Sequence, residues 1–365
     1  HMPSRRQRQM CIRDRVDGTG LASNYSLNST VINISKRVLN SSGSKLYDAN
    51  TNALASAITL SNLASTETLV DSGTASTSSA NAGSYTISNL TGISIADGTN
   101  GGLASNYTLT GGTHNFTVNQ RPLNATLARQ YDATTTSAGS TLSSFDALQG
   151  GETLTMSGSG TAASKNVANG IAMSSNGTLA LVDGTGLASN YSLNSTVINI
   201  SKRVLNSSGS KTYDANTDAL ASAITLSNLA STETLVDSGT ASTSSANAGS
   251  YTISNLTGIS IADGTNGGLA SNYTLTGGTH NFTINRRVVG VSGTRLYAAT
   301  TNAAASDLAT HANLVGSQTL TLSGTGTIAS KNVGSNKTVS IGTLALGDGT
   351  NGGLAANYTL TGGTH

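Results

Sequence analysis

The chain has 365 residues, of which 36% are hydrophobic and only 10% are charged, and its formal net charge is +2. Charged residues make up roughly 25% of an average soluble protein, so Gly, Ser, Thr, Asn and Ala fill the difference here. This mixture disfavours helix and favours short strands with tight turns, and the regular placement of the apolar residues argues against a disordered linker. The single cysteine, Cys11, excludes an intramolecular disulfide and a cysteine-based metal site.

Two further classes are excluded by the same counts. Two prolines are too few for a stiff polyproline linker. No stretch approaches the run of about 18 apolar residues that crosses a bilayer, so we expect no membrane insertion of this sequence.

Residues 1–15 differ in composition from the rest of the chain. They hold five arginines and the cysteine, and nothing similar recurs downstream. A basic run can be a nucleic-acid or membrane patch, but we interpret this one as a non-native segment that resembles translated sequencing-adapter sequence. Without its five arginines and Asp14, the net charge changes from +2 to −2. We therefore expect no nucleic-acid partner, and we expect the natural N-terminus, with any export signal, to lie outside this sequence.

Internal repeats are the strongest signal in the remaining chain. Residues 16–120 and 182–286 match at an offset of 166 with four differences. Within this long period, two tyrosine markers recur about every 83 residues. The first is a basic residue, any residue and Tyr, at Tyr47, Tyr131, Tyr213 and Tyr297. The second is Asn-Tyr, at Tyr25, Tyr107, Tyr191, Tyr273 and Tyr358.

The markers fix the boundaries of the repeats. We predict residues 16–36 as the C-terminal strands of a truncated preceding repeat, followed by repeat 1 (37–120), repeat 2 (121–202), repeat 3 (203–286) and repeat 4 (287–365). Repeat 4 stops at GGTH, before the HNFTVN strand that closes repeat 1. A missing strand leaves an apolar groove and an unpaired edge, so repeat 4 is expected to be the least stable part.

The tyrosines are expected to be core anchors, because the chain has no Trp and only three Phe. We predict that Tyr47, Tyr131, Tyr213 and Tyr297 are largely buried, in four β-rich repeats that each have their own core. A ligand site of stacked aromatic rings is the alternative for the same pattern.

Alternating apolar and polar residues predict six to eight short strands per repeat, such as those around residues 93–95, 107–109 and 116–118. The intervening DGTG, DGTNGG, GGTH and SANAG segments supply the glycines and asparagines of tight turns. Residues 53–63 could form one or two helical turns. A parallel β-helix would repeat about every twenty residues, and similarity here appears only near 83. The predicted fold is therefore all-β, a tandem array of small modules that forms an elongated rod.

The ordered motifs K-x-Y-D-A/G-T-T, G-D/E-T-L, S-K-N-V-G and G-L-x-x-N-Y-x-L resemble the YDG-type repeat domain, which is related to MBG modules. The fit is closest in repeat 2, at residues 131–135, 151–154, 164–167 and 190–191. Repeat 4 has Tyr297-Ala298-Ala299 instead of Tyr-Asp, and repeats 1 and 3 replace the SKNVG block with SSANAGSY. Such modules occur in large filamentous-haemagglutinin-like exoproteins of bacteria. The resemblance implies an extracellular or cell-surface location and an outer-membrane transporter as a possible export partner, and it implies no catalytic residues.

Candidate chemical sites are weak. Serine is so frequent that its presence does not indicate a catalytic nucleophile. Three of the five histidines, His114, His280 and His365, occupy one repeat position without a nearby pair of carboxylates. We therefore interpret them as polar turn residues. The DGTNGG turns that begin at Asp97, Asp263 and Asp348 each offer one carboxylate, fewer oxygens than the six to eight of a tight calcium site, but calcium remains the alternative to a plain turn. Gly158-Ser159-Gly160 is only a fragment of a phosphate loop.

From these features we predict a structural stalk in a secreted or surface-anchored bacterial adhesin, without catalytic, cofactor-binding or metal-binding residues. Any ligand is expected to bind elsewhere in the full-length protein. The alternative is that the repeats themselves bind a host, matrix or carbohydrate ligand through many weak copies. A binder should repeat an apolar or charged patch at the same place in each repeat, and a spacer should not.

The foreign composition of residues 1–15 generates a first prediction. Deletion of these residues should leave the melting temperature unchanged, because a segment without packed contacts contributes little to stability. Thermal unfolding followed by circular dichroism measures this, and a loss of several degrees would show that the segment belongs to the folded array.

Overall fold

The computed structural model describes residues 24, 31–87, 90–253 and 256–361. Within these residues, every helix is a three-residue 3-10 turn and all other regular structure is β-strand. The expected all-β class is therefore confirmed. The chain divides into two compact units, which are described separately. Unit 1 comprises repeat 1 as far as Arg121 together with Ser189–Tyr191, and unit 2 comprises Pro122–Ala188 and the chain from Ser192 onward.

In its described residues, repeat 1, which lies in unit 1, contains nine strands. A four-stranded sheet has the order β4-β2-β9-β6, a three-stranded sheet has the order β3-β5-β7, and β1 pairs with β8. The elements are β1 (Arg37–Val38), β2 (Asn40–Leu46), β3 (Asn52–Leu54), η2 (Ala55–Ala57), β4 (Ile58–Ser61), β5 (Leu69–Ser76), β6 (Gly83–Thr86), β7 (Ile93–Asp97), η3 (Ala104–Asn106), β8 (Tyr107–Thr108) and β9 (His114–Asn119).

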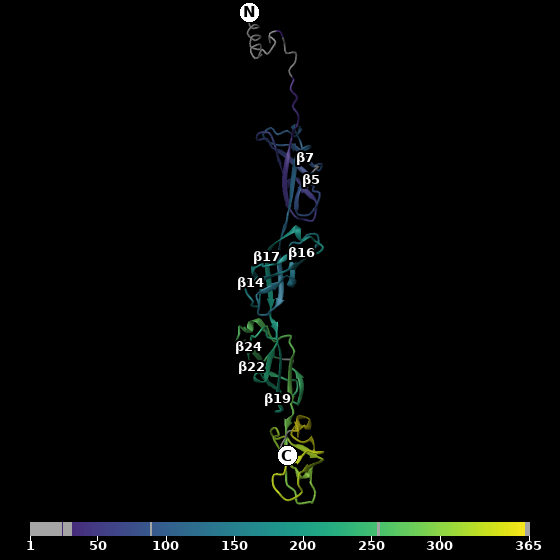
Figure 1. Cartoon of the computed structure of the whole chain (residues 1–365), viewed down its shortest axis with the longest axis vertical. Coiled ribbons are helices and arrows are strands. Elements are labelled where there is room, and N and C mark those ends of the chain that lie inside the picture. Colours follow the sequence, from purple (N-terminus) through teal and green to yellow (C-terminus); the bar gives the residue numbers. More distant parts are fainter. Residues whose placement is uncertain (1–23, 25–30, 88–89, 254–255, 362–365) are drawn as a thin grey trace. The chain divides into compact units, whose positions relative to one another are not determined.

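Repeat 3, in unit 2, has the same topology, with sheets β21-β19-β26-β23, β20-β22-β24 and β18-β25. Figure 1 shows β22 beside β24 in this repeat and β5 beside β7 in repeat 1. The elements are β18 (Arg203–Val204), β19 (Asn206–Thr212), β20 (Asp218–Leu220), η6 (Ala221–Ala223), β21 (Ile224–Ser227), β22 (Leu235–Ser242), β23 (Gly249–Thr252), β24 (Ile259–Asp263), η7 (Ala270–Asn272), β25 (Tyr273–Thr274) and β26 (His280–Asn285).

Repeat 2 joins its strands into a six-stranded sheet of order β11-β14-β15-β17-β10-β12 and a pair β13-β16. The elements are β10 (Arg121–Gln130), β11 (Thr136–Ala138), η4 (Gly139–Thr141), β12 (Leu142–Phe145), β13 (Leu154–Ser157), β14 (Ser159–Ala162), β15 (Ala168–Ser175), β16 (Ala180–Asp183), η5 (Ala188–Asn190) and β17 (Tyr191–Ser201). Gly158, at φ 76°, is the single residue between β13 and β14, which lie in different sheets, so the segment Gly158-Ser159-Gly160 joins two strands and does not precede a helix as a phosphate loop would.

Repeat 4 has only small sheets, namely β27-β35, β28-β30, β29-β32-β33 and β31-β34. The elements are β27 (Arg287–Val288), β28 (Gly290–Ser292), β29 (Asn302–Ala304), η8 (Ala305–Asp307), β30 (Thr310–Ala312), β31 (Leu320–Ser323), β32 (Thr325–Ile328), β33 (Val339–Ser340), β34 (Ala345–Asp348), η9 (Ala355–Asn357) and β35 (Tyr358–Thr359).

The last strand of repeats 1 and 3 lies in the middle of the main sheet. In repeat 1, β9 runs parallel to β2 on one side and antiparallel to β6 on the other. Its alternate residues His114, Phe116 and Val118 face the core and are buried. Because a central strand supplies hydrogen bonds to both neighbours, we call it the closing strand of the repeat.

A glycine opposite the closing strand makes room for its aromatic ring. A Cβ at Gly43 in β2 would lie 2.8 Å from the ring of Phe116, which no real side chain tolerates. In repeat 2 the same two positions hold Leu127 and Ile198, both fully buried. A glycine with an aromatic ring is thus replaced by two aliphatic side chains of equal size, and both pairs fill the core.

One expectation about the tyrosines is wrong. Tyr47, Tyr131 and Tyr213 are at most 3% exposed as predicted, but Tyr297 in repeat 4 is 61% exposed. Among the described residues, no strand pairs in parallel with the segment before Tyr297, and β28 ends at Ser292. Elsewhere the backbone amide of this tyrosine donates to the end of the closing strand, as Tyr47 does to Asn119. The rings of Tyr47, Tyr131 and Tyr213 each pack against the tyrosine of a following Asn-Tyr marker, a contact that Tyr297 lacks among the described residues.

Three smaller expectations are corrected. In the described residues, repeats 1, 3 and 4 have nine strands each and repeat 2 has eight, against the six to eight predicted. Residues 53–63 form only the 3-10 turn η2 between two strands, because the β-branched Ile58 and Thr59 favour strand. The cores are also not separate within unit 2: Tyr273 of repeat 3 belongs to the core of repeat 2, and Tyr358 of repeat 4 belongs to that of repeat 3.

Residues 1–15 lie outside the described residues, so their interpretation as foreign stays a prediction. Of the segment 16–36, which was expected to contain strands, residues 31–36 form no strand in the structure. Their apolar side chains Val31, Ile32 and Ile34 are exposed to solvent.

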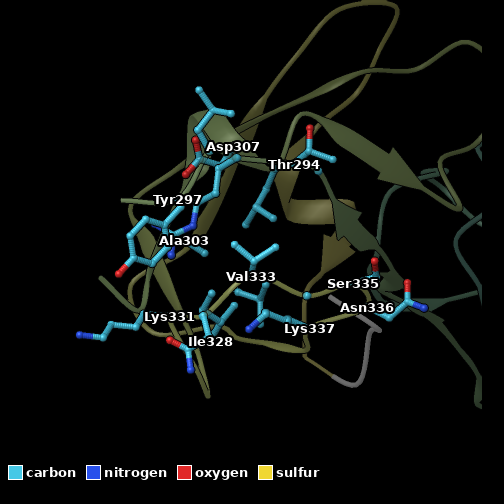
Figure 2. Close-up of a pocket in the computed structure, with 17 residues that line it drawn as sticks. Thr294, Tyr297, Ala303, Asp307, Ile328, Lys331, Val333, Ser335, Asn336 and Lys337 are labelled. Atoms are coloured by element: carbon cyan, nitrogen blue, oxygen red, sulfur yellow. The ribbon is translucent and has the colours of Figure 1, made fainter. Parts of the chain in front are cut away.

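Repeat 4 contains a groove at the expected place, although it was expected to be apolar and is lined by polar residues such as Arg295, Asn332 and Lys337 as well as by apolar ones. The groove has a volume of about 470 Å³ and lies between the segment 293–297 and the segment 331–337. Figure 2 shows Val333 and Ile328 within it and Lys331 extending away from it. The second segment corresponds to the first half of the eight-residue β15, of which only the two-residue β33 remains as strand. Both walls of the groove thus lose strand structure when no strand lies between them.

The groove generates a second prediction. Appending Asn-Phe-Thr-Val-Asn after His365 completes HNFTVN, and the added Phe and Val should bury enough apolar surface to raise the stability of repeat 4 by ~1 to 3 kcal/mol. Hydrogen exchange resolved along the chain measures the gain, with the same extension carrying Ser at the Phe and Val positions as control. Equal protection with and without the strand would show that the assigned phase of the repeat is wrong.

Candidate functional site

The DGTNGG turns use their carboxylates within the fold. Asp97 accepts a hydrogen bond from the amide of Ala104, and Asp263 and Asp348 accept the same bond from Ala270 and Ala355, each at 2.7 Å. The carboxylate thus ties the turn to the 3-10 helix before the Asn-Tyr marker. Within the described part of the chain, no three His, Cys, Asp or Glu side chains gather in a way that could hold a metal ion.

The repeated histidine is not a turn residue, contrary to the expectation. His114 and His280 begin the closing strands and are buried. His114 Nε2 donates to the carbonyl of Leu109 at 2.7 Å, so Nδ1 accepts the hydroxyl hydrogen of Ser41 at 3.0 Å. Since a carbonyl can only accept, this assigns the tautomer of the neutral ring. Ser41 is buried as well, so the pair pins the closing strand to β2. His365 lies outside the described residues.

His311 stands apart from this pattern. It lies in β30 of repeat 4, opposite Val291. Burial lowers the pKa of His311, which favours the neutral ring.

The most elaborate cluster of side chains lies where two repeats of unit 2 meet. Tyr131 of repeat 2 and Tyr273 of repeat 3 pack edge to face, with ring centroids 5.4 Å apart. Both rings are almost fully buried. An edge-to-face pair contributes about 0.5 to 1.5 kcal/mol beyond the burial of its surface. Both sequence markers therefore meet at one point, which we call junction 2/3.

A buried carboxylate joins the two tyrosine hydroxyls. Glu233 accepts from Tyr131 Oη at Oε1 and from Tyr273 Oη at Oε2, both at 2.6 Å. Lys165 of repeat 2 adds an ion pair to Oε1 at 3.0 Å. The carboxyl side chain of Glu233 is 2% exposed, whereas that of Lys165 is 35% exposed. A buried carboxylate with three donors is satisfied as a charged group, which an unpaired one would not be.

These contacts shift the pKa values in opposite directions. Burial raises the pKa of Glu233, but the hydrogen bonds from Tyr131, Tyr273 and Lys165 outweigh burial and lower it below its usual value. Burial and the hydrogen bond to Glu233 raise the pKa of Tyr273 to about 12. The hydrogen bond to Glu233 also raises the pKa of Lys165. At neutral pH the carboxylate is therefore charged and the tyrosines are neutral.

The asparagine of the Asn-Tyr marker clamps the loop of the neighbouring repeat. Asn272 is fully buried; its Oδ1 accepts from the amide of Val167 at 2.9 Å and its Nδ2 donates to Asn166 Oδ1 at 3.0 Å. Arg203, directly after the closing strand of repeat 2, donates to the carbonyl of Tyr131 at 3.3 Å and to Asn228. Aromatic, charged and amide contacts thus hold one junction.

The junction between repeats 3 and 4, called junction 3/4, uses a neutral residue in place of the carboxylate. Tyr213 and Tyr358 pack edge to face at 5.3 Å. Gln318 donates to Tyr213 Oη at 3.0 Å and accepts from Tyr358 Oη. Asn357 clamps Ala248 and Asn247 as Asn272 clamps its loop. The geometry of the junction therefore does not require a charge.

Unit 1 holds the same contacts. Tyr47 and Tyr191 pack edge to face at 5.3 Å, and Asn190 accepts from the amide of Ala82 and donates to Asn81. At the other end of repeat 1, Tyr107 is buried and donates to Glu67, but Asn106 is exposed. Burial of the marker asparagine thus requires a neighbouring loop.

Sequence reasoning found the tyrosines but missed their partners. The Asn of each marker reveals the repeat period, and its fixed position is also the signal of a buried amide that needs hydrogen-bonding partners. Lys165 belongs to the S-K-N-V motif, and nothing in the sequence singles out Glu233. Their contact joins positions 68 residues apart, and only a structure brings these together.

Two comparisons bear on the identity of the chain. The family described as the YDG domain matches residues 35–114, 118–198, 201–280 and 283–365. No curated protein sequence matches the chain. In the described residues, no helix has both the length and the apolar character needed to span a membrane.

Junction 2/3 generates a third prediction, on pH. Because the pKa of Glu233 is lowered in the folded state, the carboxylate stabilises the junction above the usual value of 4.5, and this contribution is lost as the pH falls through the lowered pKa. Glu233→Gln should therefore reduce protection of the junction amides at neutral pH by about 1 to 2 kcal/mol and remove most of the local loss in acid. Native-state hydrogen exchange at several pH values measures both effects.

The reciprocal variant Gln318→Glu is the matched control. It places a carboxylate in junction 3/4, where Ala246 stands in place of Lys165. This junction should become sensitive to acid, whereas that of the parent protein should not. An unchanged acid profile of junction 2/3 in Glu233→Gln would contradict the role assigned to the carboxylate.

Proposed function

The chain belongs to the YDG domain family, and from this premise we propose that its repeats are a structural spacer in a secreted or surface-anchored bacterial adhesin. The observation that supports a spacer is the set of buried junctions. A spacer must hold successive modules in a fixed relation, and junction 2/3 does so with an aromatic pair, a buried ion pair and an amide clamp. Repeat arrays gain stability from such nearest-neighbour interfaces.

The side chains that recur most regularly in the sequence are buried in these junctions. Tyr131, Tyr273 and Asn272 are all at most 1% exposed. Residues that are buried between repeats are not available to a ligand, so the alternative reading of the tyrosines as a stacked-ring binding site loses its main support.

The rival function, weak multivalent binding, would need an exposed patch that recurs. Leu54 and Val70 are exposed on one face of the sheet β3-β5-β7 in repeat 1, and Leu220 and Val236 recur in repeat 3. Val70 lies four residues along β5 from Thr74, the partner of Leu54, which separates the two side chains by roughly 13 Å. They form no continuous patch, and repeat 2 has Ala138 and Thr155 at these positions.

The cellular setting is part of the proposal. Export to the cell surface, by a partner transporter in the outer membrane, fits a long array with one cysteine, because strand pairing and packing alone stabilise it in an oxidising compartment. The resemblance to filamentous-haemagglutinin-like proteins supports the same setting. No step of catalysis is assigned to the repeats.

A fourth prediction tests the spacer. In a Cys11→Ser background, spin labels at Asn176 of repeat 2 and Ser244 of repeat 3 should give one narrow distance distribution. Asn272→Ala should broaden it, because the amide of Val167 loses its acceptor at the interface. Pulsed electron spin resonance measures the distribution.

Asn106→Ala is the matched control, since this residue occupies the same repeat position but is exposed. It should leave the distribution unchanged. A broad distribution in the parent protein would refute a rigid spacer. Saturable binding of matrix proteins or glycans that is lost in the Leu54→Ser, Val70→Ser variant would favour the rival function.

A further inference from the structure

The strand through which the chain enters a repeat is paired with the strand through which it leaves. In repeat 1, β2 runs parallel to β9 over six residue pairs, from Ser41 with His114 to Leu46 with Asn119. In repeat 3, β19 runs parallel to β26 over the equivalent six pairs. The short pairs β1-β8 and β18-β25 are parallel as well and extend the contact at its start. The two strands that connect a repeat to the rest of the chain are therefore hydrogen-bonded directly to each other.

The parallel orientation decides how tension along the chain acts on this contact. The chain enters at the start of β2 and leaves at the end of β9, and these two points lie at opposite ends of the ladder of hydrogen bonds. Tension therefore slides one strand along the other and loads the bonds of the ladder together. Two strands that are pulled apart from the same end lose their bonds one after another. Because forced unfolding is governed by the barrier to unfolding, a ladder whose bonds must break together resists a larger force.

We propose that repeats 1, 2 and 3 are mechanical clamps, in which the ladder between the entry strand and the exit strand carries tension along the chain. As an account of what the array does in the cell, the clamp rests on the proposed spacer function, because a spacer between a cell and a bound surface transmits tension. As a property of a repeat, it rests only on the pairing within that repeat.

The loaded ladder lies inside the main sheet and not at its edge. In the order β4-β2-β9-β6, β2 and β9 are the two central strands, and β19 and β26 are central in repeat 3. In repeat 2, β10 and β17 are neighbours inside the six-stranded sheet. Phe116 and Val118 cover the ladder of repeat 1 on its core face and are each 1% exposed. Separation of such strands leaves buried backbone groups unpaired, which costs more free energy than the opening of a solvated edge.

Further bonds fasten the ladder at both of its ends. At the start of the ladder in repeat 3, the hydroxyl of Ser207 and Nδ1 of His280 are hydrogen-bonded at 3.0 Å, and both residues are buried. At its end, the amide of Tyr213 donates to the carbonyl of Asn285 at 2.9 Å. Arg287, just beyond the exit strand, donates to the carbonyl of Tyr213 at 3.4 Å. The exit from the repeat is thus tied back to the end of the entry strand, and repeat 1 has the same three bonds.

One residue separates each ladder from the next. Gln120 lies between β9 and β10, Lys202 between β17 and β18, and Arg286 between β26 and β27. Tension therefore passes from the exit strand of one repeat to the entry strand of the next, with no loop to extend between them. The chain between β19 and β26, which contains the second sheet and the DGTNGG turn, bears no tension while the ladder holds.

Two directions of pulling on repeat 3 of the full 365-residue chain test the clamp. In a Cys11→Ser background, Lys202→Cys with Arg286→Cys places DNA handles before the entry strand and after the exit strand. Ser244→Cys with Arg286→Cys places the handles before β23 and after β26, whose facing ends are paired in antiparallel orientation. All three handle positions are exposed. Optical tweezers measure the unfolding force for both pairs of handles at the same loading rate.

The first pair of handles shears the parallel ladder and should require a several-fold larger force than the second, which opens the pair β23-β26 from one end. Both pairs pull on the same folded repeat, so its free energy of unfolding does not account for such a difference. Equal forces in the two directions would overturn the clamp. The spin-label distances between repeats 2 and 3 test the rigid spacer separately, so failure of the clamp and failure of the spacer are distinguishable.

Ser207→Ala tests the side-chain bond at the start of the ladder. It should lower the force for the first pair of handles, since shear loads this bond from the outset. It should leave the force for the second pair unchanged, because His280 lies at the end of β26 that opens last. Ser208→Ala is the matched control: its side chain is the next one along β19, is exposed, and should change neither force. A decrease of equal size in both directions would show general destabilisation and overturn the load-bearing role of the bond between Ser207 and His280.

Discussion

The closing strand is the element on which each repeat depends. It is the last part of a repeat to appear in the sequence, and yet it lies between two strands in the middle of the main sheet, as β9 lies between β2 and β6. Parallel pairing of β2 with β9 joins residues that are 73 positions apart in the sequence. The chain between them must therefore lose conformational entropy before the strands can pair. In repeat 4, no closing strand lies among the described residues, and the strands that correspond to its two neighbours are shorter, namely β28 with three residues and β33 with two.

The junctions depend on the same strand. Once the closing strand is in place, the chain continues through an arginine whose guanidinium reaches back to the tyrosine carbonyl of the repeat just completed, as Arg203 does to Tyr131. The tyrosine ring then meets the Asn-Tyr marker of the next repeat. Burial of Tyr273 in the core of repeat 2 means that the stability of one repeat includes part of its neighbour. In unit 2 the energetic unit is therefore the repeat together with its junction, as expected for nearest-neighbour arrays.

Much of this fold was predictable from the sequence, because it depends on local patterns. Alternation identified strands such as β7 and β9, glycine and asparagine marked the turns, and the repeat period located the tyrosines. The burial of Tyr131 could be predicted, but its partner could not, since its ring packs against Tyr273 of the next repeat and Tyr297, at the same repeat position, has no such partner among the described residues. The pairing of Glu233 with Lys165 was beyond sequence reasoning as well, because it depends on how two repeats meet and not on either repeat alone.

Where the repeats differ in sequence, residues that contact one another differ together. Gly43 with Phe116 and Leu127 with Ile198 are two solutions to one packing problem, and neither pair tolerates exchange of a single member: Leu opposite Phe would clash, and Gly opposite Ile would leave a cavity. Glu233 and Gln318 are likewise two ways to satisfy a pair of tyrosine hydroxyls. The residue that differs is in each case matched by a partner on the closing strand or across the junction. A repeat can therefore change its sequence widely while it keeps this fold, provided that the paired positions change together.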